Sequence, residues 1–438
     1  MIRKTRLNFA FIGAGSTSFT LNLLSDILHE DFIVSGEFRL VDIDPQALEA
    51  AYEAARAFVK SAGRDFKVTR HTDFREAIPG IDFVFFTFVT GRFPSWKQDV
   101  DICTRHGVLQ SVGDTIGPGG IIRAIRNIPV VVEVAREMEA VSPEAWAINY
   151  SNPEGALCLA IEKYTKIKTF GLCHGTPDTV AALAEEVYRV PREKLKYRAA
   201  GVNHLTWITQ LEIDGEDVYP RLRGLLGETG FDRREPISAQ LFDVFGLYPA
   251  PGDRHVGEFF PFYLKERVLA EQNYTWKNVD ISLMASWRED RLKTVSRLIS
   301  GEIGYDGIDK SGETSTHFMR ALITGEKTLE MANVINRGYI ENISDGVIVE
   351  IPCFVDSFGL HPQKIGRLPA GAAAKCESLG REYNLIADAA VNCDRAPALQ
   401  AIMLDPLAAN CDYPERLLDE LIRSYLGVLP AKWAEIYH

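Results

Sequence analysis

The first third of the chain alternates short apolar runs with segments whose apolar residues recur every three or four positions. Runs of strand length read as buried strands, and the periodic segments between them read as helices. The apolar runs are residues 7–12, 38–41, 82–88, 146–150 and 168–172. Strands that alternate with helices predict a parallel sheet covered on both faces. Residues 1–195 are therefore predicted to form a Rossmann-like, doubly wound α/β domain.

Beyond residue 195 the pattern changes. Residues 196–217 alternate apolar and polar side chains, with Asp214-Gly215 as a hairpin turn signal, and 339–354 contains another strand-rich stretch. The tail from residue 371 is mostly helical in pattern. A mixed α+β domain over residues 196–438 is expected to pack against the first domain. It would supply the other wall of a cleft and carry substrate, metal and subunit contacts.

Composition narrows the class of protein. The 438 residues carry 48 basic and 60 acidic side chains, for a formal charge of −12, and no basic cluster suggests a nucleic-acid partner. There is no apolar stretch of membrane-spanning length, and the first apolar run is too short for a signal peptide. The seven cysteines are widely spaced, without a C-x-x-C pair, which favours a reducing compartment. A cytoplasmic enzyme is expected.

A glycine-rich turn follows the first predicted strand. Gly13 permits a tight turn, and Gly15 and Ser16 open the next helix, where backbone N–H groups can approach a pyrophosphate. Asp42 ends the second predicted strand. A carboxylate at this place can accept hydrogen bonds from ribose hydroxyls and would repel a 2′-phosphate. The segment predicts an NAD site. The alternative is an ordinary strand–helix turn.

A cysteine and a histidine stand at two predicted strand ends. Cys173 ends one strand and His204 follows another about thirty residues later. A thiolate and an imidazole placed in this way could share a divalent ion. By spacing alone, two other readings stay open: a buried inert cysteine with a core histidine, and a nucleophilic Cys–His pair.

Three further segments carry polar side chains of kinds that are uncommon in a buried core. Loops 112–120 and 251–258 are rich in Gly, Asp, Arg and His, which makes them candidate walls of an active site. Ordinary turns would explain the composition of either loop equally well. Residues 149–153 end a strand with the amides of Asn149 and Asn152, which suit a ribose, a nicotinamide or a sugar.

Taken together, these segments resemble glycoside hydrolase family 4, the NAD- and metal-dependent glycosidases. The resemblance runs through residues 11–16 (FIGAGS), 41–44 (VDID), 113–120 (GDTIGPGG), 149–153 (NYSNP), 171–174 (GLCH), 201–204 (GVNH), 336–338 (NRG), 349–352 (VEIP) and 405–406 (DP). It implies a lactate/malate-dehydrogenase-like fold, NAD, usually Mn²⁺, and a homodimer or homotetramer. Cys173 and His204 become metal ligands, Asn149 a cofactor contact, and Asn152 and Asn203 substrate contacts.

The resemblance also implies a reaction. NAD oxidises the sugar 3-hydroxyl, the metal polarises the new ketone, and a base removes the C2 proton. The group on C1 then leaves, water adds, and NADH returns its hydride, so that hydrolysis occurs without net consumption of NAD. Some relatives use a tyrosine as the base, but here Phe259 and Phe260 follow Glu258 and Tyr263 is out of register. Asp114 and Asp253 are therefore the acid/base candidates, with turn or helix-cap roles as the alternative.

The substrate follows partly from the same resemblance. His174, directly after Cys173, favours an unphosphorylated α-linked sugar. Residues 252–255 (GDRH) resemble the α-galacturonidase branch, where Arg254 could fork a sugar carboxylate beside His255. The alternative for Arg254 is a surface ion pair. Gly175-Thr176 departs from that branch, which leaves α-galactosidase and α-glucuronidase open.

Two readings from other classes share the fold. An NAD-dependent 2-hydroxy-acid dehydrogenase would retain Asp42, would need no metal-binding thiolate and would accumulate NADH. A non-enzymatic protein that responds to NAD or sugar would bind NAD without turnover.

Overall fold

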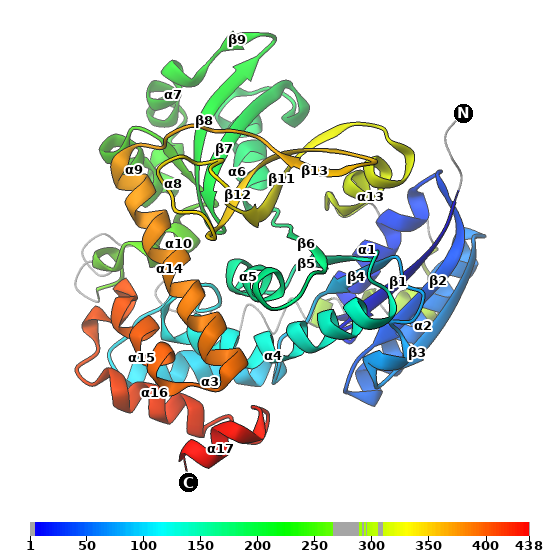
Figure 1. Cartoon of the computed structure of the whole chain (residues 1–438). Coiled ribbons are helices and arrows are strands. Elements are labelled where there is room, and N and C mark those ends of the chain that lie inside the picture. Colours follow the sequence, from blue (N-terminus) through cyan, green and yellow to red (C-terminus); the bar gives the residue numbers. More distant parts are fainter. Residues whose placement is uncertain (1–4, 266–288, 291–292, 295, 305–309, 438) are drawn as a thin grey trace.

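The N-terminal half forms a six-stranded parallel sheet. A computed structural model describes residues 5–265, 289–290, 293–294, 296–304 and 310–437. The parallel strands are β1 (Thr5–Ile12), β2 (Ile33–Val41), β3 (Asp65–His71), β4 (Phe83–Phe86), β5 (Trp146–Asn149) and β6 (Lys168–Gly171). Their order in the sheet is β3-β2-β1-β4-β5-β6, the doubly wound arrangement (Figure 1). The predicted fold class is confirmed.

Helices cover both faces of this parallel sheet. They are α1 (Thr17–His29), α2 (Pro45–Ala62), α3 (Arg92–Arg105), α4 (Gly117–Val141), α5 (Glu154–Tyr164) and α6 (Gly175–Ala182). The chain winds one way from β1 to β3 and the other way from β4 to β6, so right-handed crossovers place the two helix sets on opposite faces. The side chains of the central strands β1 and β4 are mostly buried accordingly, as in the stacked rings of Phe11 and Phe85 at 5.0 Å.

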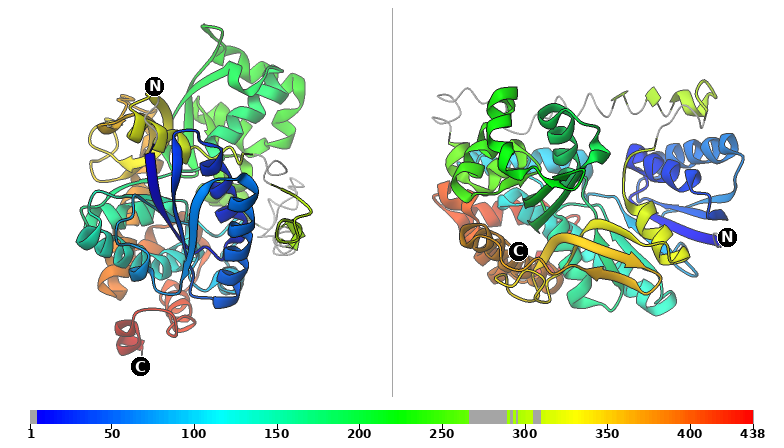
Figure 2. Two further views of the ribbon diagram at one scale, coloured as in Figure 1. Left: turned by 90° about the vertical axis from the view of Figure 1, so that its right-hand side faces the viewer. Right: turned by 90° about the horizontal axis from the view of Figure 1, so that it is seen from above.

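The sheet continues from β6 into antiparallel strands of the C-terminal half. These are β7 (Leu195–Val202), β8 (Leu205–Ile213), β9 (Glu216–Asp217), β10 (Tyr248–Ala250), β11 (Thr328–Ile335), β12 (Ile348–Asp356) and β13 (Gly359–Pro362). Asn333 of β11 pairs with Gly171 of β6, and Glu350 of β12 pairs with Gly201 of β7. Asp214 and Gly215 form the predicted β8–β9 turn, both with positive φ. In Figure 2 the blue N-terminal strands lie on one side of the molecule, away from the green segment that holds β8 and β9.

The remaining helices that are fully described are α7 (Leu222–Thr229), α8 (Phe231–Arg234), α9 (Pro236–Phe245), α10 (Asp253–Val256), α13 (Ser315–Thr324), α14 (Ala370–Asn392), α15 (Arg395–Leu404), α16 (Pro414–Arg423) and α17 (Ala431–Tyr437). Of these, α9 packs on β10, and α13 packs on β11 and β12. The long helix α14 packs on α4 and α5, and α16 contacts α3 (Figure 1). The C-terminal helices therefore return to cover the N-terminal half.

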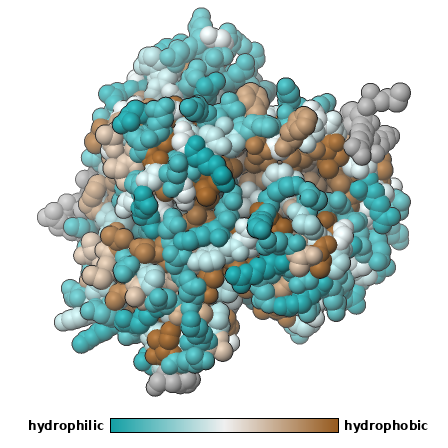
Figure 3. Space-filling view, viewed as in Figure 1, coloured by the Kyte–Doolittle hydropathy of each residue, from teal (hydrophilic) through white to brown (hydrophobic). Residues whose placement is uncertain are grey.

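The surface is mainly polar. Figure 3 shows hydrophilic residues over most of one face, with apolar side chains in smaller groups. Among the described residues, no helix is both long and apolar enough to cross a membrane.

Candidate active site

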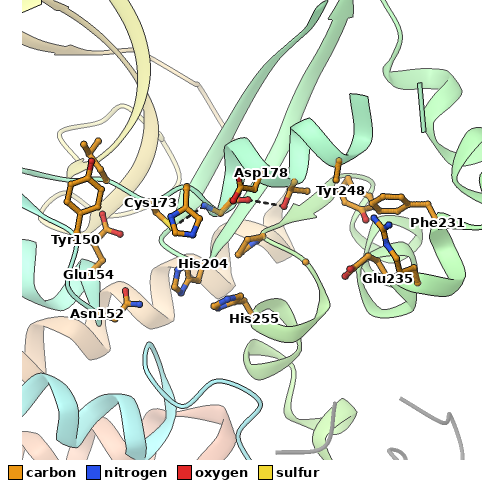
Figure 4. A pocket seen from close by; sticks show the side chains of 18 of the residues that line it. Tyr150, Asn152, Glu154, Cys173, Asp178, His204, Phe231, Glu235, Tyr248 and His255 are labelled. Atoms are coloured by element: carbon orange, nitrogen blue, oxygen red, sulfur yellow. Dashed lines mark hydrogen bonds between the residues drawn. The ribbon is translucent and has the colours of Figure 1, made fainter. Parts of the chain in front are cut away.

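A cavity of about 430 Å³ lies where the ends of β5 and β6 meet the β7–β8 turn and the start of α10. Cys173, His204 and His255 lie in its middle (Figure 4). Tyr150, Asn152 and Glu154 line one side, and Phe231, Glu235 and Tyr248 line the opposite wall. Parallel strands in such folds present ligand sites at their carboxyl ends, which is where this cavity opens.

Three side chains in this region are arranged as a metal site. One ligand atom each from Asp114, His204 and His255 lies within 4.8 Å of the others, and the two imidazole rings are 4.3 Å apart. One carboxylate and two imidazoles suit a divalent transition-metal ion. The cluster contains His204, the predicted ligand, and two residues for which other roles were predicted. Cys173, the second predicted ligand, lines the same cavity.

The protonation states of this cluster favour metal binding. Burial lowers the pKa of His204 to about 4 and the pKa of His255 to about 3, so both imidazoles are neutral at pH 7 and carry a lone pair. Burial opposes ionisation of Asp114, but the charge of Arg123 and the imidazoles hold the pKa of that carboxyl below its usual value. The residues present therefore fit a divalent ion.

Hydrogen bonds join Asp114 to its neighbours. Asn152 Nδ2 donates to Asp114 Oδ2 at 3.0 Å, and Thr115 Oγ1 donates to Asp114 Oδ1 at 2.8 Å. Thr115 Oγ1 also lies 2.7 Å from His204 Nδ1. The sequence placed Asp114 and Asn152 at the site, and the structure brings them into direct contact.

Two buried carboxyl groups hold the loop that carries Asp114. Glu258 Oε1 accepts the N–H groups of Val112 and Gly113, both at 2.9 Å. Asp405 Oδ2 accepts the N–H of Gly117 at 2.6 Å. Burial raises the pKa of Glu258 to about 8. These anchors were not predicted; the available signal was an acidic residue inside the apolar run 256–260.

A second polar group lies beneath Cys173. Asn203 Nδ2 donates to Glu154 at 2.9 Å and to Glu350 at 3.3 Å, and Asn333 Nδ2 donates to the same two carboxyl groups. Burial, followed by the charges of Glu350 and Glu154, raises the pKa of the Cys173 thiol well above its usual value. Asn203, predicted to contact substrate, is 1% exposed and belongs to this buried group.

The glycine turn has the geometry expected of a dinucleotide site. Gly13 has a φ of +90°, and a Cβ atom there would clash with Phe88. Gly15 N donates to Asp42 Oδ2 at 2.8 Å, and exposed Ser16 precedes α1. Asp42 thus stands at the end of β2 beside an open backbone turn, where a ribose can reach it.

Three predicted site residues make local structural contacts instead. Asp253 accepts the N–H groups of Ile237 and Ser238 at the start of α9, and burial followed by Glu235 raises its pKa to about 7. Arg254 Nε donates to the carbonyl of Ser111 at 3.2 Å. The amide of Asn149 is bonded to the backbone of Ser151. Among the described residues that line the cavity, none of these three occurs, and their functional roles stay predictions.

Comparison with known proteins identifies the family. The model of family 4 glycosyl hydrolases matches residues 8–188, and the model of their C-terminal domain matches residues 199–408. The chain belongs to glycosyl hydrolase family 4. It is thus a hydrolase that acts on glycosyl bonds, and neither the dehydrogenase nor the non-enzymatic reading is supported.

Several family 4 proteins resemble the whole chain. An alpha-galacturonidase of Thermoanaerobacter italicus is 31% identical, over 96% of this chain and 97% of its own. An alpha-galactosidase of Bacillus subtilis is also 31% identical, over 90% and 92%. A 6-phospho-alpha-glucosidase from gut microorganisms, solved in complex with NAD and Mn²⁺, is 21% identical with a TM-score of 0.83, over 97% and 99%.

The cavity also has lining residues that were not predicted from the sequence. Arg234 lines the outer wall, where it pairs with Glu186 and lies over the ring of Phe231 at 4.3 Å. His174, which was predicted, lines the cavity and lies 3.3 Å from Glu313. Arg234 lies in the charged segment 232–235 (DRRE), which matches none of the motifs considered above, so no local pattern marks it.

Proposed function

We propose that this family 4 enzyme hydrolyses unphosphorylated α-D-galacturonides with NAD and a divalent ion, Mn²⁺ in the first instance. The observation that carries the proposal is the cluster of Asp114, His204 and His255, whose two histidines line one cavity with Cys173. The NAD and Mn²⁺ of the 6-phospho-alpha-glucosidase, which shares the fold, support the same cofactors. A cytoplasmic homodimer or homotetramer remains part of the proposal.

The site residues named above would have the following parts in the proposed reaction. NAD would remove and return a hydride at the sugar, and the ion would polarise a sugar oxygen. Cys173 and His204 would hold the ion together with Asp114 or His255, and Asp42 would bind the ribose. Asp114, ionised at neutral pH, can accept a proton, and Asn152 orients it through the 3.0 Å hydrogen bond.

A hexuronide substrate needs a cation for its carboxylate. Arg254 was predicted for this role, but its Nε is bonded to Ser111, whereas Arg234 lines the cavity. Recognition by either arginine is testable by comparing kcat/KM for a galacturonide and a galactoside. Loss of uronide preference in Arg234→Ala, with Arg254→Ala unaffected, would assign the carboxylate to Arg234. Equal losses on both substrates in both variants would remove the carboxylate argument.

A second candidate is an α-galactosidase. It is favoured by the 31% identity to the alpha-galactosidase of Bacillus subtilis, which equals the identity to the alpha-galacturonidase. The α-glucuronidase alternative also stays open. Hydrolysis of matched 4-nitrophenyl α-D-galacturonide, α-D-glucuronide and α-D-galactoside, with and without NAD and Mn²⁺ under reducing conditions, separates the three. Nitrophenol release that needs neither addition would contradict the proposed cofactors.

A further inference from the structure

We propose that Thr115 is a positioning residue that keeps the His204 imidazole protonated on Nδ1 and thereby leaves the Nε2 lone pair for the divalent ion. This inference rests on the proposed metal-dependent function and adds to it. It names the ring atom that binds the ion and the side chain that selects this atom. Thr115 has no role in the assignments made above.

Thr115 has a single hydroxyl proton and two close neighbours that could accept it. Its Oγ1 lies 2.8 Å from Asp114 Oδ1 and 2.7 Å from His204 Nδ1, so both contacts have hydrogen-bond length. A carboxylate only accepts hydrogen bonds, and the proton of Thr115 is therefore directed to Asp114. The second contact then needs a donor, and His204 Nδ1–H is the group that can supply it.

The opposite arrangement leaves polar groups unsatisfied. If Thr115 donated to Nδ1, the neutral imidazole would carry its proton on Nε2 and could not offer that atom to a metal. Asp114 Oδ1 would also lose its donor in a place where Asp114 is 7% exposed and Thr115 is 2% exposed. Buried acceptors that lose their partner are costly, which favours the first arrangement.

The surroundings hold all three groups in place. Glu258 and Asp405 anchor the backbone on either side of Asp114 and Thr115, and Asn152 fixes the other carboxylate oxygen of Asp114. His204 stands in the β7–β8 turn with a φ of +62°, a conformation that favours glycine. Its ring is thus held by the turn on one side and by Thr115 on the other. A hydrogen bond at one ring nitrogen is the usual way in which proteins choose the metal-binding nitrogen of histidine.

The tautomer can be measured without any metal. The metal-free full chain, labelled with ¹⁵N-histidine, gives long-range ¹H–¹⁵N spectra in which the two neutral tautomers differ, and His204→Gln assigns the signal. The Nδ1–H form is expected for His204. A wild-type protein with the Nε2–H form would overturn the inference.

Two variants test the same step through metal affinity. Thr115→Ser keeps the hydroxyl, and its Mn²⁺ dissociation constant, measured by electron paramagnetic resonance, should stay within about threefold of the wild type. Thr115→Val keeps the shape and loses the hydroxyl, and should bind Mn²⁺ about 10–100-fold more weakly with unchanged NAD affinity. Wild-type affinity in Thr115→Val would overturn the inference. A wild type that binds no Mn²⁺ would instead overturn the proposed function, while the tautomer measurement still decides the role of Thr115.

Discussion

At the scale of single residues, the cavity changes the protonation of its side chains in two opposite ways. His204 and His255 lose their affinity for protons because they are buried, while the thiol of Cys173 holds its proton more tightly because of burial and the carboxyl groups of Glu350 and Glu154. An ion bound by the histidines alone would displace no proton at neutral pH. An ion bound by Cys173 would displace one.

The pH dependence of Mn²⁺ binding therefore tests Cys173 as a ligand. Between pH 6 and 8 the Cys173 thiol is protonated in the metal-free protein. Because Mn²⁺ binding would release this proton, the Mn²⁺ association constant should rise about tenfold per pH unit. Isothermal titration at pH 6, 7 and 8 measures this slope. Cys173→Ser is the matched control and should bind weakly with a flat profile. A flat profile in the wild type would leave Asp114, His204 and His255 as the ligands.

Asp42 is the second residue whose role can be isolated. Asp42→Ala removes the acceptor for Gly15 N and the proposed acceptor for the ribose, and charge-assisted hydrogen bonds of about 1.5–3 kcal/mol predict a roughly 10–100-fold weaker NAD affinity. Fluorescence titration with NAD measures the constant. Asp44→Asn, two residues further on and serving as the cap of α2, should bind NAD normally. Unchanged affinity in Asp42→Ala would refute the ribose contact.

At the scale of elements, the loop 112–120 is held by acidic side chains from other parts of the chain. Both N–H groups that Glu258 accepts go to the same oxygen, Oε1, which leaves Oε2 free to carry a proton. This fits the pKa of about 8 that burial gives the Glu258 carboxyl. The loop is thus anchored by a neutral carboxylic acid at pH 7.

Glu258→Gln should make stability less sensitive to pH. The pKa of Glu258 is raised in the folded state. Glu258 therefore makes its full contribution to the stability of the wild type below about pH 4.5, and this contribution is lost as the pH rises towards 8. Glutamine keeps an Oε1 acceptor and does not titrate. The variant should therefore gain stability relative to the wild type between pH 5 and 8, by up to about 1.4 kcal/mol per pH unit. Urea unfolding at pH 5.5, 6.5 and 7.5 tests this, and a constant difference would contradict it.

The elements that the sequence could predict are those whose pattern is local. Five of the six parallel strands contain an apolar run that predicts them, whereas the edge strand β3, with the sequence DFKVTRH, has none and was not predicted. Asp214-Gly215 marks its hairpin by residue type. The glycine turn and Asp42 follow two consecutive strands, β1 and β2, that are joined by a single crossover, so their proximity could also be predicted. The cluster of Asp114, His204 and His255 could not be predicted in this way, because two loops and helix α10, separated by up to 141 positions, converge only after the strands have paired. The role of Asp253 could not be predicted either. An aspartate at the start of a turn looks the same in the sequence whether it acts in catalysis or caps α9, as it does here.

At the scale of the whole molecule, the C-terminal helices close over the N-terminal half through a buried polar contact. Asp99 of α3 forms two hydrogen bonds with Arg126 of α4, at 2.8 and 2.6 Å, and accepts a third from Tyr425, just after α16, at 2.6 Å. Arg126 also lies over the Tyr425 ring at 4.0 Å. The apolar stripe of α16 predicts a buried face but does not reveal its partner, because Asp99 and Tyr425 lie 326 positions apart.

This contact should contribute more to stability than the exposed ion pair beside it. Asp99→Ala leaves Arg126 buried without its counter-charge and should lower the free energy of unfolding by about 3–5 kcal/mol. Tyr425→Phe removes one hydrogen bond to a charged group and should cost about 1.5–3 kcal/mol. Arg105→Ala breaks the exposed pair with Glu420, which also joins α3 to α16, and should cost under about 1 kcal/mol. Urea unfolding of the three variants under one condition ranks these losses. If Arg105→Ala costs as much as Asp99→Ala, the C-terminal helices are held by the surface contact instead.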